Sequence, residues 1–135
     1  MVSLTYPFAT EKPITSSFEA HKARTPPSTA PGTDFGARTG TAILAPIAGT
    51  VTRCYWRDAG GRSLWIQGDG VRVYVAHMSQ VARLNYERVE AGQKVGEVGS
   101  TGHSTGPHLH LSLQVKNQRG VYAWVDPMEH MAAPE

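Results

Sequence analysis

The sequence predicts a mainly β fold, in which short antiparallel strands form one small domain as a sheet or sandwich. The length of 135 residues suits a single domain with a core of its own. The 14 glycines and 9 prolines indicate frequent turns. Short apolar runs, several of them alternating with polar residues, are separated by those turns, which is typical of a fold rich in short strands.

The predicted elements follow the apolar runs in chain order. Strands are expected at residues 14–18, 43–46, 48–56, 63–67, 71–77, 95–98, 109–115 and 121–125. Hairpin turns are expected at 57–61 and 68–70, where glycines cluster. The polar, proline-rich stretch 19–31 is expected to be irregular.

The expected organisation is an N-terminal arm at 1–13, one domain at 14–127 and a polar tail at 128–135. The 13 basic and 11 acidic residues leave a net charge of +2, and the basic residues are scattered, so nucleic acid is not an expected partner. No apolar run is long enough to span a membrane, and the start lacks the features of a signal peptide. We therefore expect a chain made in the cytoplasm, and we expect it to be a monomer. Its one cysteine, Cys54, can form no intrachain disulfide.

The pair His108 and His110 stands at the start of an alternating apolar run. In a strand, side chains two positions apart point to the same face, so both imidazoles project together while Leu109 and Leu111 face a core. Two imidazoles on one rigid strand can hold a metal ion or act on a substrate bound to one. The alternative is that they are exposed polar residues on a solvated strand face.

Two further residues suit the same chemistry. Asp34 follows Gly-Thr at the start of a strand, and His77 ends the run 71–77. A carboxylate and several imidazoles are the ligand set of catalytic zinc sites, which keep one position open for water. Taken singly, Asp34 also suits a turn or cap. His77 stands at an alternate position of its run with three valines, so its side chain would face the core with theirs unless a bulge in the strand redirects it.

Five segments together closely resemble the lysostaphin-type (LytM-like) zinc endopeptidases, in that family's order and spacing. The likeness covers residues 14–127, and its most specific part is the last segment. The segments are Gly-Thr-Asp-Phe-Gly at 32–36, Gly-Thr at 40–41, Ala-Pro-Ile-Ala-Gly-Thr-Val at 45–51, Tyr-Val-Ala-His-Met at 74–78, and the stretch from Gly99 to His110. The resemblance implies a small antiparallel fold with a substrate groove. It also implies zinc-dependent cleavage of cross-link or stem peptides in bacterial peptidoglycan.

The resemblance implies roles residue by residue. Asp34 and His110 match metal ligands, whereas His77 and His108 match catalytic histidines that stay off the metal, with their base and oxyanion roles left open. The family's first ligand, a histidine four residues before the aspartate, is replaced here by Ala30. We expect His21 to supply the third ligand, with His103 as the weaker alternative.

The residues from 18 to 34 also look like a variant found in phage-encoded relatives, in which a histidine precedes the loop and Pro-Gly-Thr-Asp follows it. The expected function is therefore a zinc endopeptidase acting on peptidoglycan, as a phage lysin or a virion-associated wall hydrolase. The alternative, motivated by Ala30, is a non-catalytic module that keeps the fold to bind peptidoglycan or a protein. A structural virion component is a third, weaker interpretation.

Overall fold

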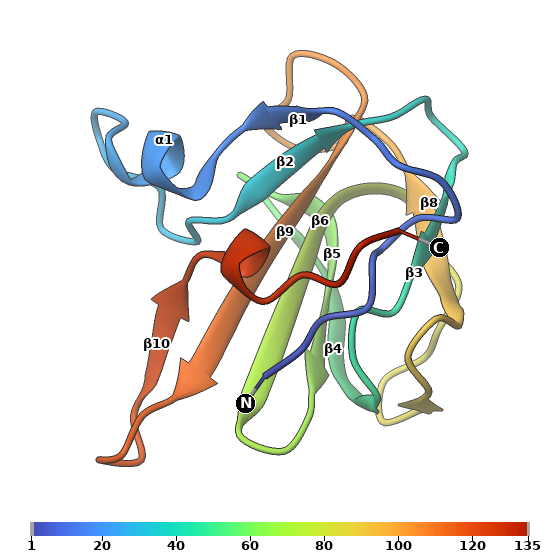
Figure 1. Cartoon of the computed structure of the whole chain (residues 1–135). Helices are drawn as coiled ribbons and strands as arrows, with labels where there is room; N and C mark the ends of the chain where they lie inside the picture. The colour runs from blue at the N-terminus through green and yellow to red at the C-terminus, as the bar shows by residue number, and fades with distance from the viewer. Residues whose placement is uncertain (1, 135) are drawn as a thin grey trace.

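The computed structural model describes residues 2–134 and folds them around one large antiparallel sheet (Figure 1). The main path of the sheet runs in the order β1-β2-β9-β6-β5-β4-β7, and β10, β3 and β8 branch from it. The strands are β1 (Ile14–Ser16), β2 (Thr33–Gly36), β3 (Ala42–Leu44), β4 (Gly49–Arg57), β5 (Gly61–Gln67), β6 (Val71–Val81), β7 (Arg88–Val89), β8 (Lys94–Val98), β9 (His108–Lys116) and β10 (Tyr122–Val125). The helices are α1 (Phe18–Lys22) and the short 3₁₀ helix η1 (Pro127–Glu129).

Strand β9 is the centre of the arrangement because three strands pair with it. Its first half pairs with β2, its second half with β10, and its other edge with β6. Strand β6 is longer than its pairing with β9, and beyond residue 77 it pairs with β8 instead. The expected strand 71–77 therefore continues to Val81, because β8 offers a second partner after β9 ends.

The core lies on one face of this sheet. Alternate residues of β6 and β9, among them Val73 and Leu111, are fully buried there. The N-terminal arm completes this core, since Leu4 and Phe8 are buried in the same cluster. A bridge between Leu4 and Met131 joins the arm to the tail, so the two chain ends lie against one core.

The expectation that residues 19–31 are irregular is wrong for their first part, because α1 occupies residues 18–22. Ser17 caps this helix: its side chain accepts a hydrogen bond from the backbone nitrogen of Ala20. Such a cap satisfies one of the donors that a helix start leaves unpaired. Neither β7 nor η1 was expected from the alternation, since β7 has only two residues and η1 only three.

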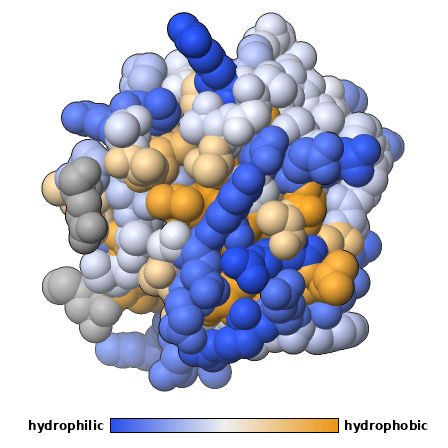
Figure 2. Space-filling view, turned by 90° about the vertical axis from the view of Figure 1, so that its right-hand side faces the viewer, coloured by the Kyte–Doolittle hydropathy of each residue, from blue (hydrophilic) through white to orange (hydrophobic). Residues whose placement is uncertain are grey.

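The surface mixes polar and apolar residues. On the side shown in Figure 2, hydrophobic residues form separate patches with polar residues between them. Within residues 2–134, no helix has the length and apolar character needed to cross a lipid bilayer.

Candidate metal centre

The pairing of β2 with β9 brings Asp34 opposite His110. The two side chains lie on the sheet face away from the apolar core, and His110 Nδ1 is 2.9 Å from Asp34 Oδ1. Both residues are buried, with exposed fractions of 7% and 6%. The contact joins two residues far apart in sequence, and it follows directly from the strand register.

The third member of the cluster, His21, comes from α1. This residue is buried, and its Nε2 lies 3.3 Å from Asp34 Oδ2. Its ring packs edge-on against that of His110, with 4.9 Å between ring centroids. Ligand atoms of His21, Asp34 and His110 all lie within 4.8 Å of one another. The structure thus brings together the three residues that the sequence analysis nominated as metal ligands.

Four histidines of the site are held in the same way, each by a backbone carbonyl. A carbonyl oxygen only accepts, so the ring nitrogen facing it carries a hydrogen and the other ring nitrogen carries a lone pair. The four contacts are His21 Nδ1 to Ser17 O at 2.8 Å, His77 Nδ1 to Thr101 O at 2.7 Å, His108 Nδ1 to Gly106 O at 2.8 Å and His110 Nε2 to Ala30 O at 2.8 Å. Metal-binding histidines are oriented by such contacts.

This arrangement fits a cation between His21, Asp34 and His110. The nitrogen that His110 turns to the carboxylate is the one without a hydrogen when Nε2 donates to Ala30. The Nε2 of His21 is likewise buried without a hydrogen-bond partner. Three electron-pair donors that face one another in a buried site repel unless a positive charge lies between them. Two imidazoles and a carboxylate are ligands that zinc accepts, and the three donor atoms lie close enough together that one ion could be held between them.

The pKa values of the site residues also favour a bound cation. Burial raises the pKa of the Asp34 carboxyl, and hydrogen bonds and charge from His110 and His21 lower that pKa below its usual value when these rings are protonated towards the carboxylate. Burial lowers the pKa of His110, although Asp34 opposes this. The cluster is therefore an ionised carboxylate beside a neutral imidazole at neutral pH, which is the protonation state that binds a metal.

His77 reaches the site through a bulge in β6. Between Val75 and Met78, β6 has one residue more than its partner β5 needs, and His77 adopts a left-handed φ of 62°. Met78 then takes the core position with no exposed surface, and His77 faces the site. A bulge that re-aims a side chain, and a left-handed residue that is not glycine, are both features of functional sites.

The loop 99–107 holds the two histidines that face the cluster. The rings of His77 and His108 are 4.5 Å apart, and His108 Nε2 is 3.8 Å from Asp34 Oδ1. Burial lowers the pKa of His77 to about 4, so its imidazole is neutral at neutral pH.

The loop packs closely on the β4–β5 turn: a Cβ on Gly102, whose φ is 76°, would lie 2.3 Å from the nitrogen of Gly61.

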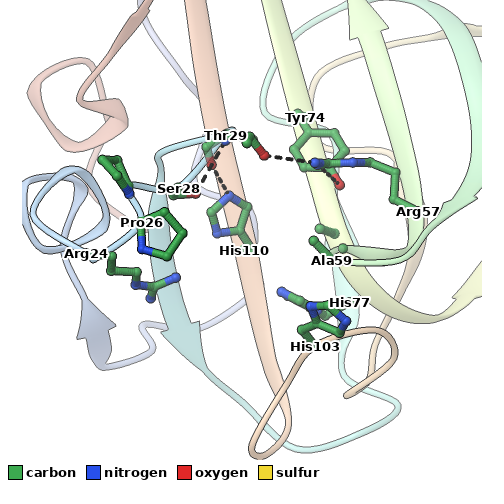
Figure 3. Close-up of a pocket in the computed structure, with 14 residues that line it drawn as sticks. Arg24, Pro26, Ser28, Thr29, Arg57, Ala59, Tyr74, His77, His103 and His110 are labelled. Carbon is green, nitrogen blue, oxygen red and sulfur yellow. Dashed lines mark hydrogen bonds between the residues drawn. The ribbon is translucent and has the colours of Figure 1, made fainter.

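A pocket of about 320 Å³ adjoins the cluster, and Figure 3 shows His110 in its wall. Arg24 and Pro26 border one side, and Arg57 and Tyr74 border the other. The sequence patterns did not identify the two arginines as site residues. Arginines in loops are common, and only the tertiary structure shows that these two flank the cluster.

Arg57 connects two parts of the pocket wall by hydrogen bonds. It donates to the Tyr74 hydroxyl at 2.8 Å and to Thr29 Oγ1 at 3.1 Å. Thr29 precedes Ala30, whose carbonyl holds His110, so Arg57 fixes the loop that orients this histidine. His103 lines the pocket beside His77, but it is not one of the three converging residues.

Ala30 lies on the far side of His110 from Asp34. Its carbonyl accepts from His110 Nε2 and from Ser112 Oγ, while the Asp34 contact is made by Nδ1. The Ala30 side chain is buried against Tyr74 and Ala76. The backbone carbonyl of Ala30 thus orients His110, and the Ala30 methyl group packs in a small apolar cluster.

Comparison with known proteins matches residues 28–122 to the family model "Peptidase family M23". Lysostaphin of Staphylococcus simulans is 37% identical over 89 residues, which are 64% of this chain and 18% of lysostaphin. The solved structure of its catalytic domain has a TM-score of 0.67 at 28% identity and covers 95% of this chain and 90% of that domain.

Two further relatives were found. The peptidoglycan DD-endopeptidase ShyC of Vibrio cholerae is 32% identical over 114 residues, covering 81% of this chain and 24% of ShyC. An Ala-to-His mutant of the catalytic domain of EnpA, a prophage-encoded M23 protein from Enterococcus faecalis, has a TM-score of 0.63 at 29% identity. It covers 94% of this chain and 89% of that domain. The chain spans about a quarter or less of the full-length curated relatives.

Proposed function

The chain belongs to peptidase family M23, and from this we propose that it is a zinc-dependent endopeptidase that cleaves peptide bonds of bacterial peptidoglycan. One observation carries the proposal: a buried cluster of three metal-ligand side chains with two further histidines directed at it. The peptidoglycan substrate is supported by the similarity to ShyC, which is described as a peptidoglycan endopeptidase.

In this proposal His21, Asp34 and His110 hold the ion. Zinc, when bound, polarises a carbonyl group and lowers the pKa of water to about 7. His21 Nε2 and His110 Nδ1 are the nitrogens available for it, because the other nitrogen of each ring donates to a carbonyl. Ser112 adds a contact to His110 Nε2 at 2.8 Å and so helps to fix that ring.

His77 and His108 carry the proton transfers. Each ring donates its Nδ1 hydrogen to a carbonyl of loop 99–107, so Nε2 is the nitrogen through which either ring can exchange a proton. Either nitrogen can take the proton from the attacking water and return it to the leaving amine, as general acid–base catalysis requires. Whichever of the two histidines is not the base can, when protonated, donate a hydrogen bond to the developing oxyanion.

Hydrolysis of purified cell walls tests the function. The protein with one equivalent of zinc is incubated with walls or cross-linked wall peptides, and the new amino groups are counted by a colorimetric assay. We expect release that a chelator stops and added zinc restores. No release by the zinc-containing protein from walls of several peptide types would overturn the proposal and favour the alternative of a binding module that keeps the fold.

The finer proposal is that the chain is a phage product, acting as a lysin or as a virion-associated hydrolase. It is supported by the similarity to prophage-encoded EnpA and by the histidine that precedes the Pro-Gly-Thr-Asp segment. Its test is detection of the chain by mass spectrometry in purified particles or in induced lysates. Its absence from both would contradict the phage assignment while leaving the peptidase function intact.

A further inference from the structure

The sheet face that carries the metal centre continues beyond it along the same strands. Residues two and four positions after His110 on β9, Ser112 and Gln114, share its face, and Arg72 lies on that face of β6. Neighbouring strands add Trp65 from β5 and Trp124 from β10. We call this second area the aromatic face, and its members are Arg53, Tyr55, Trp65, Gln67, Arg72, Gln114, Tyr122 and Trp124.

Ring contacts link the aromatic face to the metal centre through Tyr74, which is itself buried. The ring of Trp65 lies 5.0 Å from that of Tyr74 and 5.9 Å from that of Trp124. Tyr74 in turn lies 6.1 Å from His110. Trp65 and Trp124 are half-buried and line an open depression, so part of each ring surface is accessible from solvent.

Planar polar groups are fixed between these rings. Arg72 donates to Gln67 Oε1 at 2.7 Å and stacks 3.6 Å from the Tyr122 ring centroid. Gln67 donates to the Tyr122 hydroxyl at 2.9 Å. Within residues 2–134, neither Arg72 nor Arg53 forms an ion pair with a carboxylate. Their remaining donors are held in place for a ligand, which lowers the entropy cost of binding.

This combination suits a sugar chain. A pyranose ring has a face of C–H groups that packs flat on an aromatic ring, and a rim of hydroxyl and acetamido groups that needs hydrogen-bond partners. Trp65 and Trp124 supply the flat apolar surface, and the guanidinium and amide groups supply the partners. A purely apolar protein partner would leave the free donors of Arg53 and Arg72 and the Gln114 amide unpaired, which is costly.

The spacing suits a substrate that joins sugar to peptide. Gln114 is four residues from His110 on one strand, so the two areas are about 13 Å apart. An extended peptide of roughly four residues covers the same distance. A sugar on the aromatic face and its attached peptide at the metal centre can therefore be bound together, and each raises the effective concentration of the other.

We propose that the aromatic face is a binding site for a chain of N-acetylated amino sugars, the glycan strand to which the wall peptides are attached. The assignment of this polymer rests on the proposed peptidoglycan function. The site would hold the glycan while the attached peptide is cleaved, so the domain would favour peptides still linked to their sugar chain.

Binding of chitotetraose, a linear tetramer of N-acetylglucosamine, is the direct test. Titration of the full chain, followed by NMR or calorimetry, is expected to show saturable binding that needs no zinc. Trp124→Ala and Arg72→Ala are each expected to weaken it by about tenfold. Trp56→Ala is the matched control, because Trp56 is 57% exposed on the opposite side of β4 from Arg53 and Tyr55. It should bind as the wild type does.

A second readout compares cleavage of sugar-linked and free wall peptides. Trp124→Ala and Arg72→Ala should lower the ratio of sugar-linked to free cleavage about tenfold, and Trp56→Ala should leave it unchanged. The inference is overturned if the wild type does not bind chitotetraose, if Trp56→Ala loses as much as the two variants, or if a single-stranded oligonucleotide binds there and chitotetraose does not. Sugar binding without any wall cleavage would instead overturn the proposed function and leave this inference standing.

Discussion

The imidazole rings of His77 and His108 lie 4.5 Å apart, and one loop holds both of them. Thr101 accepts from His77 Nδ1 and Gly106 accepts from His108 Nδ1, and both carbonyls belong to loop 99–107. The two rings come from different strands, β6 and β9, so the loop sets their relative position. A single loop therefore controls both candidate proton-transfer groups without contributing a side chain to the proposed chemistry.

Replacing His77 or His108 by alanine should abolish most wall cleavage while leaving the metal bound. We expect a loss of about 10²–10⁴-fold for each variant, because proton transfer by a positioned group contributes that much. Zinc content by elemental analysis should stay at the wild-type level. His130→Ala is the control, since His130 contacts Val2 on another part of the surface. Loss of zinc together with activity would contradict the assignment of these two residues as catalytic groups.

Removal of the His21 ring should weaken zinc binding. His21→Ala leaves two ligand side chains, and we expect a loss of zinc affinity of more than about 100-fold in a competitive chelator titration. His103→Ala tests the competing ligand and should leave the affinity unchanged. If His103→Ala lost zinc and His21→Ala kept it, the third ligand would be His103.

A histidine at position 30 should not improve the site. Ala30 lies behind His110 and its side chain is buried against Tyr74, so a larger side chain there crowds the contact. We expect Ala30→His to cost about 1–3 kcal/mol in urea unfolding and to give no gain in zinc affinity. Ala59→His, on the exposed rim of the pocket, controls for the addition of a histidine. Tighter zinc binding by Ala30→His alone would show that the natural site lacks a ligand.

The metal-free protein should lose stability in mild acid. Burial holds the pKa of His77 at about 4, whereas an unfolded histidine titrates near about 6.5. Above the higher value both states are neutral and His77 has no effect. Between the two values only the unfolded chain binds the proton, so the free energy of unfolding falls by about 1.4 kcal/mol per pH unit as pH decreases.

Burial lowers the pKa of His110 as well, so this residue adds a change of the same sign. Urea unfolding from about pH 7 to about pH 5 measures the combined slope. His77→Gln removes one of the two groups and should make the slope shallower. An unchanged slope would mean that His77 is not neutral in the folded protein.

The strand pattern was enough to place His108 and His110 on one face, because alternation is a local property. The approach of Asp34 to His110 depends on the pairing of β2 with β9, and only the family resemblance suggested it. Alternation alone would direct His77 into the core, and the bulge that turns it is set by the neighbouring strands. The same limit applies to Trp65 and Trp124, which meet only after their strands pair.

The sequence also contains a local signal for the start of α1, which was not predicted. Ser17 is the N-cap of α1, and its side chain accepts a hydrogen bond from the backbone nitrogen of Ala20. A serine directly before an apolar residue is a recognisable helix start. The prolines that follow favoured an irregular stretch. The burial of His21 on the Asp34 side could not be read from the sequence, because it depends on how the loop after α1 returns to β2.

The short length of α1 gives a bound ion a role in the stability of the chain. Five residues are too few for a helix to persist in isolation, so contacts with the sheet must hold it. An ion shared by His21 and Asp34 would tether the two ends of a stretch of about a dozen residues in the folded chain. Because the ion binds the folded chain in preference to the unfolded one, it would stabilise the fold. Chelation would open this loop, and trypsin should then cut faster at the exposed Lys22 and Arg24.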